Sequence, residues 1–176
     1  YALPGQRSRG YRLGMPASLE TLLAESPYLA GLAERNAEWF AAALTTPDTA
    51  LAELLAGIAA AGESAASEDE VATTLRAGKG RVALLAGAAE VTGRWTTAQS
   101  TAALSDLADS ALDAGLAVLL RLAVAKGQVV AGYASPAKSG LTIFALGKHG
   151  GRELNYSSDI DIVAFFDPEV PALTDP

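Results

Sequence analysis

Apolar and polar residues alternate with a helical period over most of this chain, from Leu19 to about Lys126. Large apolar side chains recur every three or four residues, as in the run from Tyr28 to Leu44, and this spacing places them on one face of a helix. Residues that favour helix ends divide the stretch into separate segments. The pattern predicts an all-α region of five or six helices without an internal repeat.

Polar residues of the kinds that cap helices set the expected boundaries. Ser26 and Thr46 each precede a proline, which suits the first helical position. Ser67 and Glu70 have the spacing of a capping box. The expected helices cover residues 18–25, a segment from 26 onward, 46–61 with Gly62 as the terminator, 67–92, and 97–126 with Gly127 as the terminator.

The helix expected at residues 67–92 contains two glycines and a group of basic residues. Gly78 and Gly80 each cost about 1 kcal/mol relative to alanine in a helix interior, which predicts a kink or local mobility near Gly78. Arg76 and Lys79 share one face of this helix, and Arg81 is rotated away from them. Two interpretations stay open: the pair approaches phosphate or an acidic partner, or it belongs to an ordinary solvated face.

The pattern changes after the last long helix. Residues 141–167 predict a strand, a glycine turn, a polar turn and a second strand, which ends at Asp167 because Pro168 follows. The predicted fold class is therefore α+β, predominantly α. The expected divisions are a flexible arm at residues 1–16, a helical region at 17–131, a linker at 132–139 and the beginning of a second domain at 140–176.

Two carboxylates open the second expected strand. Asp159 and Asp161 are two residues apart, so in a strand both side chains leave the same face. Paired carboxylates of this kind suit Mg²⁺, which takes its other ligands from water and substrate phosphates. Gly150 and Gly151 are expected to adopt positive φ and to let the backbone approach a phosphate, with a short helix starting in residues 151–155. Taken alone, two aspartates that enter a strand are more often a solvated turn, and a glycine pair between two strands is usually a hairpin loop.

Other polar residues near this turn have two interpretations each. Lys148 favours a phosphate or is simply solvated. Ser157 and Ser158 bind phosphate oxygens or stabilise the turn through local hydrogen bonds. His149, the only histidine, is not expected to be a catalytic base.

Charge and composition exclude several classes. The chain has 13 basic and 20 acidic residues, a net charge of −7 and a pI near 4.7, which argues against a nucleic-acid surface. It has no cysteine, and its longest apolar stretch, residues 112–124, is interrupted by Asp113 and Arg121, as in a core helix and not a membrane span. A cytoplasmic location without a membrane partner is the default expectation. Asp106, Asp109 and Asp113 fall on one helix face and are expected to face solvent, and Trp39 and Trp95 are expected to be packing residues.

Residues 147–163, GKHGGRELNYSSDIDIV, closely resemble the nucleotidyltransferase signature of the glutamine synthetase adenylyltransferase/adenylyl-removing enzymes. The segment LRAGKGRVALL at residues 75–85 is a second point of resemblance, although the family is usually more basic there and this chain has Ala77, Gly78 and Gly80. His149 stands where the family often has leucine. Such enzymes carry two polymerase β-like nucleotidyltransferase domains, and the resemblance is to the first of them, which removes AMP.

The resemblance implies a function and a set of roles. Asp159 and Asp161 would be the catalytic Mg²⁺ ligands, and Gly150, Gly151, Ser158 and Lys148 would contact phosphate. Glutamine synthetase, a PII signalling protein and ATP, ADP and phosphate would be the partners. The family's site uses a third carboxylate, but Asp167, Glu169 and Asp175 are poor candidates, so the domain is expected to be truncated and inactive alone. The alternatives are the AMP-adding copy of the domain, another nucleotidyltransferase, or a non-catalytic docking module for glutamine synthetase.

Overall fold

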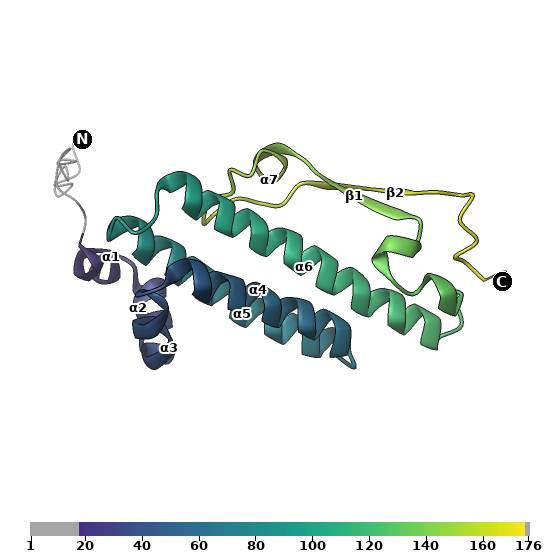
Figure 1. The fold of residues 1–176 in the computed structure, drawn as a ribbon, viewed down its shortest axis with the longest axis horizontal. Helices are drawn as coiled ribbons and strands as arrows, with labels where there is room; N and C mark the ends of the chain where they lie inside the picture. Colours follow the sequence, from purple (N-terminus) through teal and green to yellow (C-terminus); the bar gives the residue numbers. More distant parts are fainter. Residues whose placement is uncertain (1–17, 175–176) are drawn as a thin grey trace, which may run out of the picture.

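Three long helices lie side by side and form the body of the protein (Figure 1). The computed structural model describes residues 18–174, so the predicted arm at residues 1–16 and the residue Asp175 lie outside the described part. The helices are α1 (Leu19–Glu25), α2 (Pro27–Arg35), α3 (Ala37–Ala43), α4 (Pro47–Ser64), α5 (Glu68–Val91), α6 (Thr97–Ala125) and the short α7 (Gly147–Gly150), and the strands are β1 (Leu141–Ala145) and β2 (Ile162–Phe166). The predicted α+β class, predominantly α, is confirmed.

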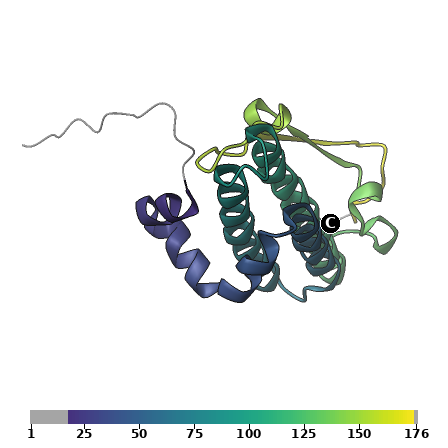
Figure 2. The same ribbon diagram turned by 60° about the vertical axis from the view of Figure 1, so that its left-hand side comes forward.

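The three-helix body has a different covering on each side (Figure 2). Helices α1 and α2 pack on α5, and the hairpin of β1 and β2 lies along α6. Two 3-10 turns, η1 (Ala131–Tyr133) and η2 (Pro136–Lys138), occupy the expected linker, and η2 contacts α6. No helix in residues 18–174 is both long enough and apolar enough to cross a membrane.

Most of the predicted helix caps are confirmed. The side chains of Ser18 and Ser26 accept hydrogen bonds from the amides of Thr21 and Leu29. Ser67 accepts from the Glu70 amide, but the Glu70 carboxylate accepts from Ala66 and not from Ser67. The full capping box belongs to α6, where Thr96 and Gln99 bond reciprocally.

The prediction that Gly62 ends its helix is wrong, because α4 continues to Ser64. Gly62 lies where α4 crosses α6, and an added Cβ would stand 2.7 Å from the Cα of Ala114. The guanidinium of Arg121 donates to the carbonyls of Gly62 and Ala65. These bonds satisfy backbone acceptors at the end of α4, two residues after Gly62. The glycine therefore allows close helix packing and does not terminate the helix.

Gly78 and Gly80 also have packing roles, because α5 runs without interruption through both. A Cβ at Gly78 would lie 2.9 Å from Cδ1 of Ile58, and one at Gly80 would lie 2.8 Å from Cδ2 of Leu32. The loss of helix propensity at these positions is offset by the close approach of α4 and α2. This close packing accounts for both glycines, so the predicted kink near Gly78 is not needed to explain their presence.

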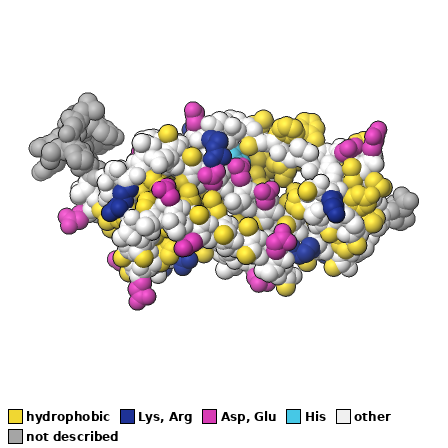
Figure 3. Space-filling model, viewed as in Figure 1, with side chains coloured by type: hydrophobic (Ala, Val, Ile, Leu, Met, Phe, Trp, Pro, Cys, Tyr) yellow, Lys and Arg dark blue, Asp and Glu magenta, His cyan; other side chains and the backbone are white. Residues whose placement is uncertain are grey.

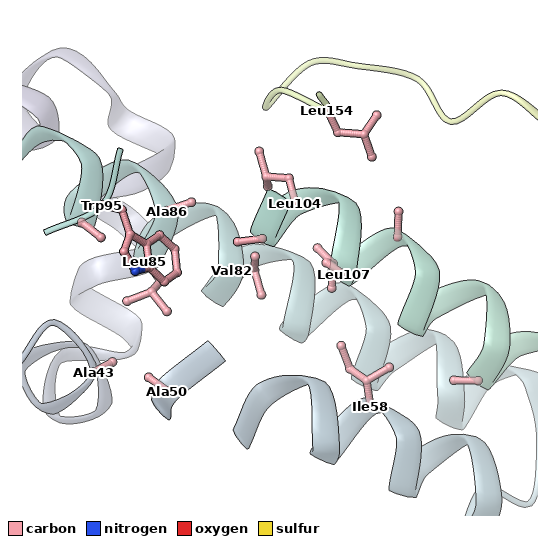
Figure 4. Close-up of a cluster of buried hydrophobic side chains, with 14 of the residues drawn as sticks. Ala43, Ala50, Ile58, Val82, Leu85, Ala86, Trp95, Leu104, Leu107 and Leu154 are labelled. Atoms are coloured by element: carbon pink, nitrogen blue, oxygen red, sulfur yellow. The ribbon is translucent and has the colours of Figure 1, made fainter. Parts of the chain in front are cut away.

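The core lies between α4, α5 and α6, and Figure 4 shows Trp95 within it. Trp95 is 4% exposed and donates through Nε1 to Oδ1 of Asp48, at 3.0 Å. Trp39 packs against this core, with the Arg81 guanidinium 5.3 Å from its ring centroid. The predicted packing roles of Trp39 and Trp95 are confirmed. Leu154, from the segment between the strands, is 4% exposed and joins the same core.

The two strands form an antiparallel hairpin with Leu141 opposite Phe166 and Ala145 opposite Ile162. Alternate residues of β1 are half-buried, whereas every residue of β2 is exposed. Figure 3 shows apolar side chains gathered over the hairpin. The second strand is predicted to end at Asp167 and ends one residue earlier, at Phe166; the amide of Asp167 donates to the Gly140 carbonyl.

Candidate functional site

The glycine turn follows β1 directly and contains the short helix α7. Positive φ occurs at Gly147 (54°) and at Arg152 (57°), and Gly151 has a φ of −81°, so the positive φ expected at Gly150 and Gly151 is not found. The helix expected in residues 151–155 is also wrong, because α7 begins at Gly147 and ends at Gly150. Gly150 is needed for another reason: an added Cβ would stand 2.5 Å from the carbonyl oxygen of Ala145.

Two contacts hold the glycine turn on α6. His149 is 3% exposed, and its Nε2 shares a 2.7 Å hydrogen bond with Oδ1 of Asp109. Arg152 donates through Nη2 to Oδ1 of Asp106 at 2.5 Å, and this contact raises the pKa of the guanidinium. Figure 3 shows acidic and basic side chains beside each other where α7 meets α6.

The expectation that Asp106 and Asp109 face only solvent is therefore wrong. The two aspartates are three residues apart on α6. Asp106 bonds to Arg152, 46 residues further along the chain, and Asp109 bonds to His149, 40 residues further along. The acidic face of α6 and the basic residues of the turn were the available signal in the sequence, but this signal alone does not specify which residues pair. Asp113 is exposed and makes no ion pair within residues 18–174.

The polar turn after the glycines is stabilised by its own side chains. The backbone amide of Asn155 donates to Oγ of Ser158 at 3.1 Å, and the side-chain Oδ1 of Asn155 accepts from the backbone amide of Ser157 at 3.1 Å. Both serine hydroxyls also bond to Oδ1 of Asn155. The local role expected for Ser157 and Ser158 is confirmed, and the phosphate role of Ser158 stays a prediction.

The expectation that Asp159 and Asp161 open the second strand is wrong, because they lie just before β2, which begins at Ile162. The strand geometry that would send both side chains from one face therefore does not apply to them. The carbonyl of Asp161 accepts from the Leu146 amide at 2.8 Å, so the pairing of the two strands extends one residue beyond the hairpin. Oδ2 of Asp161 would lie 3.2 Å from a Cβ on Gly147, which places this carboxylate against the first residue of the glycine turn. Asp159 lines a separate cavity between this segment, α5 and α6. Both aspartates are exposed.

The carboxylate oxygens of Asp159 and Asp161 are the kind of ligand that Mg²⁺ prefers. Neither the Asp159 nor the Asp161 side chain makes a hydrogen bond or ion pair with another residue in the range 18–174, so their oxygens are available as ligands. Mg²⁺ is commonly held by one or two carboxylates and completes its shell with waters and phosphate oxygens. Within the described range, no group of three or more His, Cys, Asp or Glu residues is arranged to hold a metal ion. The two exposed carboxylates would supply oxygen ligands to Mg²⁺ only together with waters and phosphate oxygens, and their metal role stays a prediction.

The two glycines of the turn should respond differently to alanine. Gly150→Ala is expected to destabilise the turn by about 2 kcal/mol, because its Cβ would clash with the Ala145 carbonyl. Gly151→Ala is the matched control, since its nearest neighbour would lie 3.5 Å away and its φ suits alanine. Hydrogen exchange at the Leu146 amide measures the effect. Equal protection in both variants would contradict the close approach at Gly150.

Tyr156 lies beside the carboxylate segment and against α5. The residue is 51% exposed, but its hydroxyl would be 3.5 Å from a Cβ on Gly87. This partial burial, with a smaller effect of Glu90, raises the pKa of Tyr156 to about 12. The ordinary tyrosine pKa is 10, so below pH 10 the neutral side chain makes its full contribution to the free energy of unfolding. This contribution is lost as the pH rises from 10 towards 12. Ultraviolet titration should show a late tyrosine transition that is missing in Tyr156→Phe. If that variant instead loses a transition near pH 10, the burial of the hydroxyl is contradicted.

The fold and the site describe an α+β protein in which a helical bundle carries a glycine turn followed by two exposed carboxylates. A family profile described as Glutamate-ammonia ligase adenylyltransferase matches residues 17–174. The chain belongs to this family.

Several curated relatives are similar to nearly the whole chain. A "Bifunctional glutamine synthetase adenylyltransferase/adenylyl-removing enzyme" of Bradyrhizobium sp. (strain BTAi1) is 41% identical over 91% of this chain. Proteins of the same name from Rhodopseudomonas palustris (strain TIE-1) and Caulobacter vibrioides are 36% and 42% identical over 89% and 86% of it. The chain spans only 16–17% of the length of these relatives. No solved structure matches the chain.

Proposed function

We propose that this chain supplies the carboxylates and the glycine turn of a site that removes AMP from adenylylated glutamine synthetase. The observation that carries the proposal is the position of Asp161, whose carboxylate lies against Gly147 where the hairpin pairing ends. An anion bound at the glycine turn would therefore meet a metal held by Asp161. The name of the relatives, which combines adenylyltransferase and adenylyl-removing activity, supports the choice of reaction and of glutamine synthetase as partner.

Asp159 and Asp161 would hold Mg²⁺, which would supply positive charge to the attacking and leaving oxygens. The amides of Gly150 and Gly151 donate to the carbonyls of Leu146 and Gly147, so they are not free to bind phosphate. Gly150 instead allows the turn to pack against the Ala145 carbonyl, and Gly151 leaves the exposed side of the turn without a side chain. Lys148, which is exposed beside them, and Ser158 would contact phosphate oxygens.

The reaction is a phosphorolysis. An oxygen of inorganic phosphate attacks the phosphorus of the AMP group, and the bond between that phosphorus and the tyrosine oxygen breaks. The products are ADP and the tyrosine hydroxyl, whose oxygen takes up a proton. The residues of this chain position the two phosphates and screen their charge, which is the main task of a protein in phosphoryl transfer.

Addition of AMP from ATP would use the same carboxylates, so the removing direction rests on the resemblance of residues 147–163 to the first domain copy. Control by a PII signalling protein and a cytoplasmic location, with no nucleic acid or membrane as partner, belong to the same proposal.

The test is the release of ADP from adenylylated glutamine synthetase by the full-length protein. Phosphate-dependent and Mg²⁺-dependent ADP is the expected product. AMP incorporation from ATP without any ADP release would show that the direction of the proposal is wrong.

A further inference from the structure

A cavity of about 450 Å³ lies between α5, α6 and the segment that carries Asp159. Its floor is apolar and includes Leu104, Leu107 and Leu154. Arg76 and Lys79 line it from α5, and Ser158 and Asp159 line it from the polar turn. The structure thus brings the basic face of α5 to the candidate site, although the two lie about 80 residues apart in the sequence.

The two cations at this cavity are free to bind a ligand. Arg76 and Lys79 are exposed, and neither makes a hydrogen bond or ion pair with any residue from 18 to 174. Arg81, on the same helix, is different: it donates to Asn36 at 2.9 Å and packs on Trp39, so it has a structural role. The basic residues of α5 therefore divide into one that holds the bundle and two that face the cavity.

The combination of features matches a phosphate monoester. A guanidinium binds phosphate oxygens in a bidentate geometry, and an ammonium beside it adds a mobile positive charge. The apolar floor suits the organic group attached to the phosphate. The volume of the cavity is also that of a ligand site, since such cavities typically measure about 300–1,000 Å³. Asp159 lines the same cavity from the polar turn, so a metal that it held would face the same phosphate.

We propose that Arg76 and Lys79 form an anion subsite that holds a phosphate monoester above the apolar floor, at the edge marked by Asp159. Its assignment to the AMP group rests on the proposed function, whereas the binding of the anion does not. The helical region would then be part of the site and would not act only as a support for it.

The test is calorimetric titration of residues 1–176 with AMP and with inorganic phosphate, at low salt and without Mg²⁺. Because AMP also reaches the apolar floor, it should bind about tenfold more tightly than phosphate. The variant Arg76→Gln/Lys79→Gln should weaken the binding of both ligands about tenfold or more. The matched control Arg94→Gln/Lys126→Gln removes one arginine and one lysine that are exposed and lie outside the cavity, and it should stay within about twofold of the wild type.

The outcomes separate this subsite from the proposed reaction. If the Arg76/Lys79 variant binds like the wild type, or if the control weakens binding equally, the subsite is overturned. Equal affinities for AMP and phosphate would overturn the role of the floor. If the full-length protein transfers no AMP but the chain binds phosphate through Arg76 and Lys79, the proposed reaction fails and the subsite stands.

Discussion

Asp161→Asn in the full-length protein is expected to lower the rate of AMP removal by several orders of magnitude without unfolding the protein. The Asp161 side chain is exposed and bonds to no residue in the described range, so asparagine removes no structural contact. Its backbone carbonyl, which accepts from Leu146, is unchanged by the substitution. What is lost is a negatively charged oxygen ligand for a divalent cation, and neutral amides replace it poorly.

Asp113→Asn is the matched control for this prediction. Asp113 is also exposed and without an ion pair among the described residues, but it lies on α6 and away from the glycine turn. The two variants change the net charge equally. Rates should be measured with urea unfolding midpoints for both, and a near wild-type rate in Asp161→Asn would contradict the metal role.

Gly62→Ala is expected to destabilise the helical bundle by about 3 kcal/mol. Its Cβ would lie 2.7 Å from the Cα of Ala114 and 2.9 Å from its Cβ, and a backbone atom in a buried helix cannot move aside without shifting α6 against α4. The contact also lies beside the Arg121 bonds to Gly62 and Ala65, so a shift would strain these as well.

The same helix contains the control. Gly57 is exposed in α4, and a Cβ there would meet nothing within 4 Å. Gly57→Ala should therefore stabilise the chain by about 0.5–1 kcal/mol through helix propensity alone. Chemical unfolding of residues 1–176 gives both values, and similar stability changes in the two variants would show that α4 and α6 do not approach as closely as described.

Local signals predicted most of the helices. Ser18 and Ser26 mark real N-caps because a cap depends on bonds within one turn of the chain. The same reasoning gave a wrong helix end at Gly62. Glycine favours a helix end locally but also permits close packing, and only the position of Ala114 decides between the two roles. The domain boundaries proposed at residues 131 and 139 stay a prediction.

The candidate site was predictable as a string of residues but not as a geometry. The motif predicts a strand, a turn and two carboxylates, and the structure has this order. The hydrogen bond between Asp109 and His149 joins residues 40 positions apart, and the cavity lined by both the α5 cations and the Asp159 segment brings together residues about 80 positions apart. No local periodicity contains such pairings, because they arise from how the hairpin lies along α6. The φ values of Gly147 and Gly151 likewise depend on the hydrogen bonds of the finished turn.

The most direct test of the account compares both reactions of the full-length protein in the variant Asp159→Asn/Asp161→Asn. One assay follows phosphate-dependent ADP release from adenylylated glutamine synthetase, and the other follows AMP incorporation from ATP. The account predicts that ADP release is lost while AMP incorporation is retained. Retained ADP release, or selective loss of AMP incorporation, would contradict the claim that these two carboxylates belong to an adenylyl-removing site.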